Sequence, residues 1–168
     1  MTDSTAYISK DFVKKHNIRV IPLSVHWDDN TYLDGVDITP AQFYERLDKS
    51  STIPSTSQPS AGDFLQVFKE LASHCDGIIV PLISSGISGT VASAKTAASM
   101  FSEASVEVID SRTTTAGLAL VVTAIAQSAS DGKSLKEIKN LAEGIVKRLK
   151  LFFAVDTLKY LHKNGRIG

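Results

Sequence analysis

Short apolar runs alternate with helical patterns along this chain. Four largely apolar runs predict buried strands, at 18–25, 78–83, 106–109 and 151–155. Between them, apolar residues recur at helical spacing, as in 64–71. Solid apolar strands that alternate with helices are typical of a parallel sheet covered by helices on both faces. The pattern therefore predicts an α/β fold.

Polar residues at fixed spacing mark where the helices begin. Thr39, followed by Pro40 and Gln42, predicts a capping box, and Ser134 with Glu137 predicts another. With the apolar spacing, these signals predict helices at about 10–16, 40–49, 61–71, 90–101, 115–129, 135–149 and 156–163.

The sequence also predicts the connections between these elements. Residues 27–37 contain Asp-Asp-Asn and Asp-Gly, which predicts a hairpin. Residues 50–60 are rich in Ser, Thr and Pro and predict a loop. Residues 1–5 read as a turn with no strand before it. Pro22 predicts an edge position or a bulge in the strand 18–25.

The stretch Ile78–Ala94 predicts a binding corner. Its apolar strand ends in Ser84-Ser85-Gly86, and an Ala-rich helix begins at Ser88-Gly89-Thr90, with Ser88 expected as the cap. The first N–H groups of a helix lack internal partners, and the helix dipole makes that end partly positive. Such a helix start at the carboxyl edge of a parallel sheet can hold an anion without a charged side chain.

Composition narrows the class of protein. The chain has 168 residues, 43% of them hydrophobic, and a formal net charge of zero, which is typical of a folded domain and argues against nucleic acid as a partner. Cys75 is the only cysteine, which fits a reducing compartment, and we expect it to pack at a helix end. No apolar run approaches the roughly 20 residues that span a bilayer, and no signal-peptide pattern is present. We therefore expect a cytoplasmic protein.

One catalytic motif fits in part. Gly86-Ile87-Ser88 begins the nucleophile elbow G-x-S-x-G, but Thr90 stands where the motif requires glycine. Asp156 and His162 follow in the chain order of the α/β-hydrolases, so a serine hydrolase that uses Ser88 is an alternative. Helix capping alone, however, also explains a serine at this position.

Two hydroxyl-rich segments favour binding over catalysis. Ser55–Ser60 and Ser84–Thr90 both precede helices and should lie at the carboxyl edge of the sheet. Asp3 and Asp110, at predicted strand ends, fit either this edge or a turn. Neutral hydroxyls with free N–H groups suit a single carboxylate, and no strong base accompanies them. No metal-ligand spacing is present at His16, His26 or His74.

Six motifs together carry a family resemblance. They are T-D-S-T at 2–5, I-P-L at 21–23, T-S-Q-P-S at 56–60, S-G-I-S-G-T at 85–90, I-D-S-R-T at 109–113, and D-T-L-K-Y-L with N-G-R-I-G at 156–168. The chain resembles the DegV family over essentially its whole length. These are bacterial fatty-acid-binding proteins that serve as the binding subunits of fatty acid kinase. The pair T-S-Q-P-S and S-G-x-S-G-T is highly specific.

The resemblance implies two α/β domains with an acyl chain between them. Thr56 and Ser88 would hold the carboxylate of a long-chain fatty acid, with backbone N–H groups around Gly89. Ser57, Thr90 and Arg166 are further candidates. Such a protein takes a fatty acid from the membrane by transient contact and presents it to a separate kinase catalytic subunit. The resemblance implies no cofactor, no metal and no chemistry of its own.

The chain departs from the family pattern at both ends. We expect residues 1–155 to form the first DegV-type domain without its first strand. Residues 156–168 would begin the connection to a second domain that is largely absent. A fragment without function is a further alternative.

Overall fold

A parallel sheet lies at the centre of the computed structural model, which describes residues 1–167. β6 (Gly77–Leu82) and β7 (Ser105–Asp110) pair in parallel along their whole length. β1 (Thr2–Asp3) pairs in parallel with β2 (Val20–Ile21). The Thr2 hydroxyl donates to the carbonyl of Pro81 at 2.8 Å, which places β1 beside β6.

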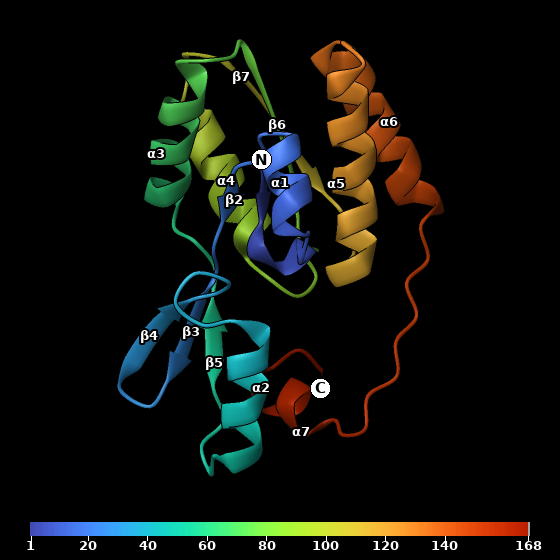
Figure 1. Ribbon diagram of the computed structural model, residues 1–168. Coiled ribbons are helices and arrows are strands. Elements are labelled where there is room, and N and C mark those ends of the chain that lie inside the picture. Colours follow the sequence, from blue (N-terminus) through green and yellow to red (C-terminus); the bar gives the residue numbers. More distant parts are fainter. Residues whose placement is uncertain (168) are drawn as a thin grey trace.

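Helices cover this sheet on both faces, as the sequence predicts (Figure 1). α3 (Ala61–Ala72) and α4 (Thr90–Ser99) pack together on one face, where Phe64, Phe68 and Val80 are fully buried. α5 (Thr115–Ser130) and α6 (Leu135–Arg148) pack on the other, where their residues Val121 and Ala142 are fully buried. The short α1 (Lys10–Lys15) precedes β2. The predicted α/β class is therefore confirmed.

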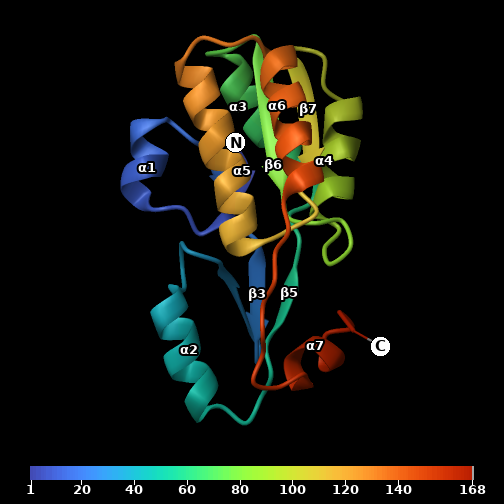
Figure 2. The same cartoon turned by 90° about the vertical axis from the view of Figure 1, so that its right-hand side faces the viewer.

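A second, antiparallel sheet extends from the first (Figure 2). Its strands are β3 (Ser24–Trp27), β4 (Asn30–Leu33) and β5 (Ser55–Ser57), in the order β4-β3-β5. α2 (Pro40–Lys49) covers one face, where Val25, Trp27 and Ile38 are buried against Phe43. The predicted hairpin at 27–37 is confirmed as the β3–β4 connection and the turn that follows it.

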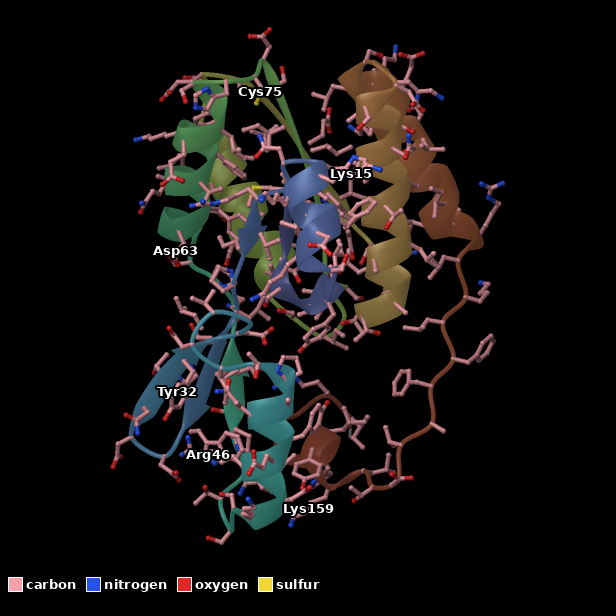
Figure 3. The ribbon with its side chains drawn as sticks, viewed as in Figure 1. Lys15, Tyr32, Arg46, Asp63, Cys75 and Lys159 are labelled. Carbon is pink, nitrogen blue, oxygen red and sulfur yellow. The ribbon has the colours of Figure 1, made fainter. Side chains whose placement is uncertain are left out.

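One cluster ties α2 to the hairpin. The Arg46 guanidinium lies 4.5 Å from the Trp27 ring centroid, and it donates to Asp28 at 2.8 Å and to the Tyr32 hydroxyl at 3.0 Å. Figure 3 labels Tyr32, which lies on β4, and Arg46, which lies on α2. The predicted capping boxes at Thr39 and Ser134 both form, and so does one at Ser60.

The predictions of a single strand at 18–25 and of a loop at 50–60 are wrong. The apolar run 18–25 is not one strand: the chain leaves the parallel sheet after Ile21 and enters the antiparallel sheet at Ser24. Pro22 stands at this break, because it has no N–H group to continue a ladder. The loop 50–60 contains β5, a strand without apolar residues that forms by pairing with β3.

Two smaller predictions also need correction. Residues 2–3 form a short strand and Ser4–Ala6 a 3-10 helix (η1), rather than only a turn. Cys75 is exposed at the end of α3 rather than packed, and its thiol donates to the carbonyl of Leu71 at 3.3 Å. Figure 3 shows Cys75 at this end of the molecule.

The predicted strand 151–155 does not form. This segment pairs with no strand among the described residues, and its side chains at Phe152 and Phe153 are 89% and 71% exposed. An apolar run becomes a strand only where a neighbouring strand accepts its hydrogen bonds. The helix predicted at 156–163 is shorter than expected, as α7 (Lys159–Lys163). The domain boundary at 155 stays a prediction, and Gly168 lies outside the described residues.

Candidate functional site

The loop between β6 and α4 differs in detail from the predicted corner. Gly89, not Ser88, is the N-cap residue of α4, and it makes no side-chain cap. The Ser88 hydroxyl instead accepts from the Thr90 N–H at 3.3 Å and lies 2.8 Å from the Thr90 hydroxyl. Thr90 is fully buried, so its hydrogen bonds hold the Ser88 side chain in place.

Two carboxylates anchor this loop to the sheet. Asp110 accepts from the Ser85 hydroxyl at 2.6 Å and from the backbone N–H groups of Ser85 and Arg112. Partial burial alone would raise the pKa of Asp110, but these hydrogen bonds outweigh it and hold the pKa below its usual range. Asp110 therefore acts as a turn residue.

Asp3 anchors the other side of the loop. Its carboxylate accepts from the Ile83 N–H at 2.7 Å, and from the N–H and hydroxyl of Thr5 at 2.9 and 2.6 Å. Asp3 is fully buried, and burial raises its pKa in spite of these hydrogen bonds, with the charge of Asp34 adding to the rise. The role of Asp3 is structural: it fixes Thr5 and Ile83, which both line the cavity described next.

β5 presents its hydroxyls to opposite sides of the small sheet. Thr56 is paired with Val25, on the face that α2 covers. Ser57 lies on the other face, where its hydroxyl is 2.8 Å from Nε2 of His26. The Nδ1 atom of His26 lies 2.9 Å from the Thr31 hydroxyl, so this histidine connects all three strands.

A cavity of about 490 Å³ lies between the parallel sheet and the α2 layer. It brings together Thr56, Ser88 and Arg166 from three distant parts of the chain, and the remaining lining is mainly apolar. Its volume is in the range of small-molecule sites, about 300–1,000 Å³. The lining residues other than these three are Thr5, Tyr7, Leu23, Val25, Asp34, Pro40, Phe43, Tyr44, Ile83, Ile87 and Thr115. We call this space the main cavity.

A second space, the polar cavity, adjoins the main cavity. It measures about 300 Å³ and shares Ile87, Ser88 and Arg166 with the main cavity. Gly89 lines it, and Gln58 lies so close that a Cβ on Gly89 would be 2.8 Å from its Nε2 atom. The other lining residues are Ser85, Gly86, Asn164 and Gly165.

The predicted site residues are thus only partly brought together. Thr56, Ser88 and Arg166 share the main cavity, whereas Ser57, Gly89 and Thr90 do not line it. Sequence reasoning missed several lining residues, namely Tyr7, Asp34, Gln58 and Asn164. Gln58 and Asn164 belong to the motifs T-S-Q-P-S and N-G-R-I-G, so those motifs already contained a signal for them.

The hydrolase arrangement does not form among residues 1–167. The hydrogen-bond partner of the Ser88 hydroxyl is Thr90, and neither Asp156 nor His162 lines the cavities that contain Ser88. In the same residues, no cluster of three or more metal-ligating side chains is found. None of the helices described is long and apolar enough to cross a bilayer.

A largely apolar cavity with a few polar groups at one end is typical of a small-molecule binding site. The family described as "Uncharacterised protein, DegV family" matches residues 1–168, and the chain belongs to this family. A DegV domain-containing protein of Clostridium acetobutylicum is 38% identical over 172 residues, which cover all of this chain and 60% of that protein. Protein DegV of Bacillus subtilis is 36% identical over 170 residues, with the same coverage.

Solved structures agree with this assignment. A DegV family protein from Thermus thermophilus, described by its fatty acid binding, matches with a TM-score of 0.90 at 33% identity, over 99% of this chain and 59% of that one. A stearic acid-binding protein from Eubacterium ventriosum matches with a TM-score of 0.87 at 33% identity, over 99% and 59%. The chain therefore spans about 60% of the length of the relatives it matches.

Proposed function

We propose that this protein binds a fatty acid, with its carboxylate at Thr56 and Ser88 and its acyl chain in the main cavity. The observation that carries the proposal is the convergence of these two hydroxyls in one apolar cavity, although they are 32 positions apart in the sequence. Related proteins described as binding fatty acids, one of them stearic acid, share the fold at TM-scores of 0.87 to 0.90.

The chemistry of the cavity matches a carboxylate with a long apolar tail. Two hydroxyls can donate to the carboxylate oxygens, and the Arg166 guanidinium supplies a cation that lines the same cavity. Apolar side chains such as Leu23 and Ile83 would bury the methylene groups, each worth about 0.8 kcal/mol.

The remaining predicted residues take supporting roles in this proposal. Thr90 would orient the Ser88 hydroxyl, to which it is hydrogen-bonded. Gly89 would contribute the backbone N–H groups at the start of α4, where the helix dipole favours an anion. Ser57 would act through His26, which holds β5 and therefore Thr56 in place.

We further propose that the protein presents the bound fatty acid to a separate fatty acid kinase and catalyses nothing itself. The support is that Ser88 and Arg166 line both the main cavity and the polar cavity, so a carboxylate between them would be accessible to a partner. The acyl phosphate formed there would serve phospholipid synthesis. On this proposal the protein works in the cytoplasm and contacts the membrane only transiently.

Native mass spectrometry of the complete gene product, purified from bacteria, tests the binding proposal. We expect a co-purified long-chain fatty acid. Ser88→Ala and Thr56→Val should each weaken binding about 10- to 100-fold, because each removes a hydrogen bond to a charged group, worth about 1.5–3 kcal/mol. The matched control is Ser99→Ala at the exposed end of α4, where the hydroxyl contacts only the carbonyl of Thr96. Absence of any fatty acid from the wild-type protein would refute the proposal.

The alternatives give different results in two further assays. A serine hydrolase would react with a fluorophosphonate probe at Ser88, and we expect no labelling. A fragment without function would show no cooperative unfolding transition by calorimetry, and we expect a single transition. Acyl phosphate formation with a fatty acid kinase tests the presentation step separately from binding.

A further inference from the structure

A further cavity of about 320 Å³ lies on the far side of Tyr7 from the main cavity. We call it the distal cavity. Its lining is mainly apolar, with two lysines from α1. The residues found only here are Thr2, Asp3, Ser4, Ala6, Ile8, Lys10, Val13, Lys14, Val20, Pro22, Gly35 and Val36.

Shared lining residues order the three cavities. Ser88 and Arg166 line the polar and main cavities but not the distal cavity. Tyr7, Asp34 and Pro40 line the main and distal cavities but not the polar one. The main cavity therefore continues into a polar space at its hydroxyl end and into an apolar space beyond Tyr7. An amphiphile with its head at Ser88 would have its tail directed toward Tyr7.

Tyr7, which lies between the main and distal cavities, has an unusual backbone conformation. It ends η1 with φ 46° and ψ 42°, in the left-handed region, where its N–H donates to the carbonyl of Ser4 at 3.1 Å. A bulky side chain is rare in this region and persists only where the surroundings hold it. The ring is 57% exposed, so it is not locked into a core. Partial burial raises the pKa of its hydroxyl to about 12, and the charge of Asp34 adds to the rise.

We propose that Tyr7 sets the length of acyl chain that this protein accepts. Its ring closes the tail end of the main cavity, and the distal cavity receives the last carbons of a longer chain only when the ring is displaced or removed. The inference rests on the proposed fatty-acid binding and identifies a residue that determines its specificity.

Affinity should depend on the length of the acyl chain in a measurable way. Each methylene transferred from water to an apolar site tightens binding about fourfold. In a series of saturated fatty acids, affinity should rise with each added carbon until the tail reaches Tyr7, and then stay level. Removing the ring should move this plateau to longer chains.

The experiment measures dissociation constants for this series with the complete wild-type protein and the Tyr7→Gly variant. Glycine suits the left-handed backbone at this position, so the variant should fold, and Tyr7→Ala is the second variant if it does not. We expect the variant to gain about fourfold for each carbon beyond the wild-type plateau. The control is Leu120→Ala on α5, which removes a similarly exposed side chain that is 63% accessible and lines neither cavity.

A second substitution tests where the additional carbons lie. Val36 is exposed and lines the distal cavity only, so Val36→Trp should fill that space. Combined with Tyr7→Gly, it should return the plateau to the wild-type length. A plateau that stays at the same length in both Tyr7 variants, while the wild-type protein binds normally, would overturn this inference alone. A shift that Val36→Trp does not reverse would overturn the distal cavity as the location. No binding by the wild-type protein would overturn the proposed function as well.

Discussion

Replacing Asp3 with alanine should destabilise this protein strongly, although Asp3 does not line the main cavity. Its carboxylate is fully buried and accepts three hydrogen bonds, two from Thr5 and one from the Ile83 N–H. The Ile83 bond joins the end of β1 to the end of β6, and the Thr5 bonds cap η1. Alanine would remove all three acceptors at once.

The size of the stability loss depends on whether each freed donor stays buried or can hydrogen-bond to water. Ile83 is only 7% exposed, so its N–H would stay buried without an acceptor, at a cost of about 1–3 kcal/mol. Thr5 is partly exposed and can turn to water, so its two bonds should add less. Removing a buried carboxylate also relieves some desolvation. We expect a net loss of about 2–4 kcal/mol, a large share of the roughly 5–15 kcal/mol typical of a domain.

Urea unfolding followed by circular dichroism measures this loss directly. Asp3→Asn is the informative companion, because its amide must place an N–H against either Ile83 or Thr5, and we expect it to retain part of the stability. Thr5→Val is the control, since it removes only the hydroxyl donor and should cost about 0.5–1.5 kcal/mol. A loss below about 1 kcal/mol for Asp3→Ala would show that the three bonds do not support the fold as argued.

Two further predictions concern pH and packing. Because hydrogen bonds lower the pKa of Asp110, its contribution to stability is present above the usual value of 3.8 and is lost as the pH falls through the lowered pKa. Ser85→Ala should therefore destabilise the protein at neutral pH, and the difference should shrink in acid unfolding curves; a constant difference would contradict this. Gly144→Ala on α6 should stabilise the protein by about 0.5–1 kcal/mol, because no atom lies within 4 Å of the added Cβ. Gly117→Ala on α5 should destabilise it, because that Cβ would clash with the Thr113 hydroxyl, and thermal unfolding compares the two.

Local signals in the sequence predicted the helices well. A capping box needs only four consecutive residues, so Thr39 and Ser134 identify their helices without knowledge of the rest of the fold. The strands 77–82 and 105–110 were predictable because both are rich in β-branched residues and lie between helices.

Most of the errors concern features that depend on distant partners. β5 contains only Ser and Thr, and it is a strand because β3 pairs with it. The run 151–155 has the composition of a strand, but no strand pairs with it among residues 1–167. The predicted cap at Ser88 was wrong by one residue, because the side chain turns back to Thr90. The cavity walls at Tyr7 and Asp34 come from loops whose positions only the complete fold determines.

Only some residues of the motif T-S-Q-P-S contact the proposed ligand site, and the others stabilise the fold. Ser57 is hydrogen-bonded to a histidine of β3, and Ser60 forms the capping box of α3. Gln58 lies against the loop before α4 and so connects the two hydroxyl-rich segments. Of the three hydroxyls, only that of Thr56 faces the main cavity. A substitution at Ser57 or Ser60 should therefore lower stability more than it lowers affinity. Thr56→Val should instead lower affinity at nearly constant stability. Thr56 is therefore the residue of this motif whose substitution tests binding itself.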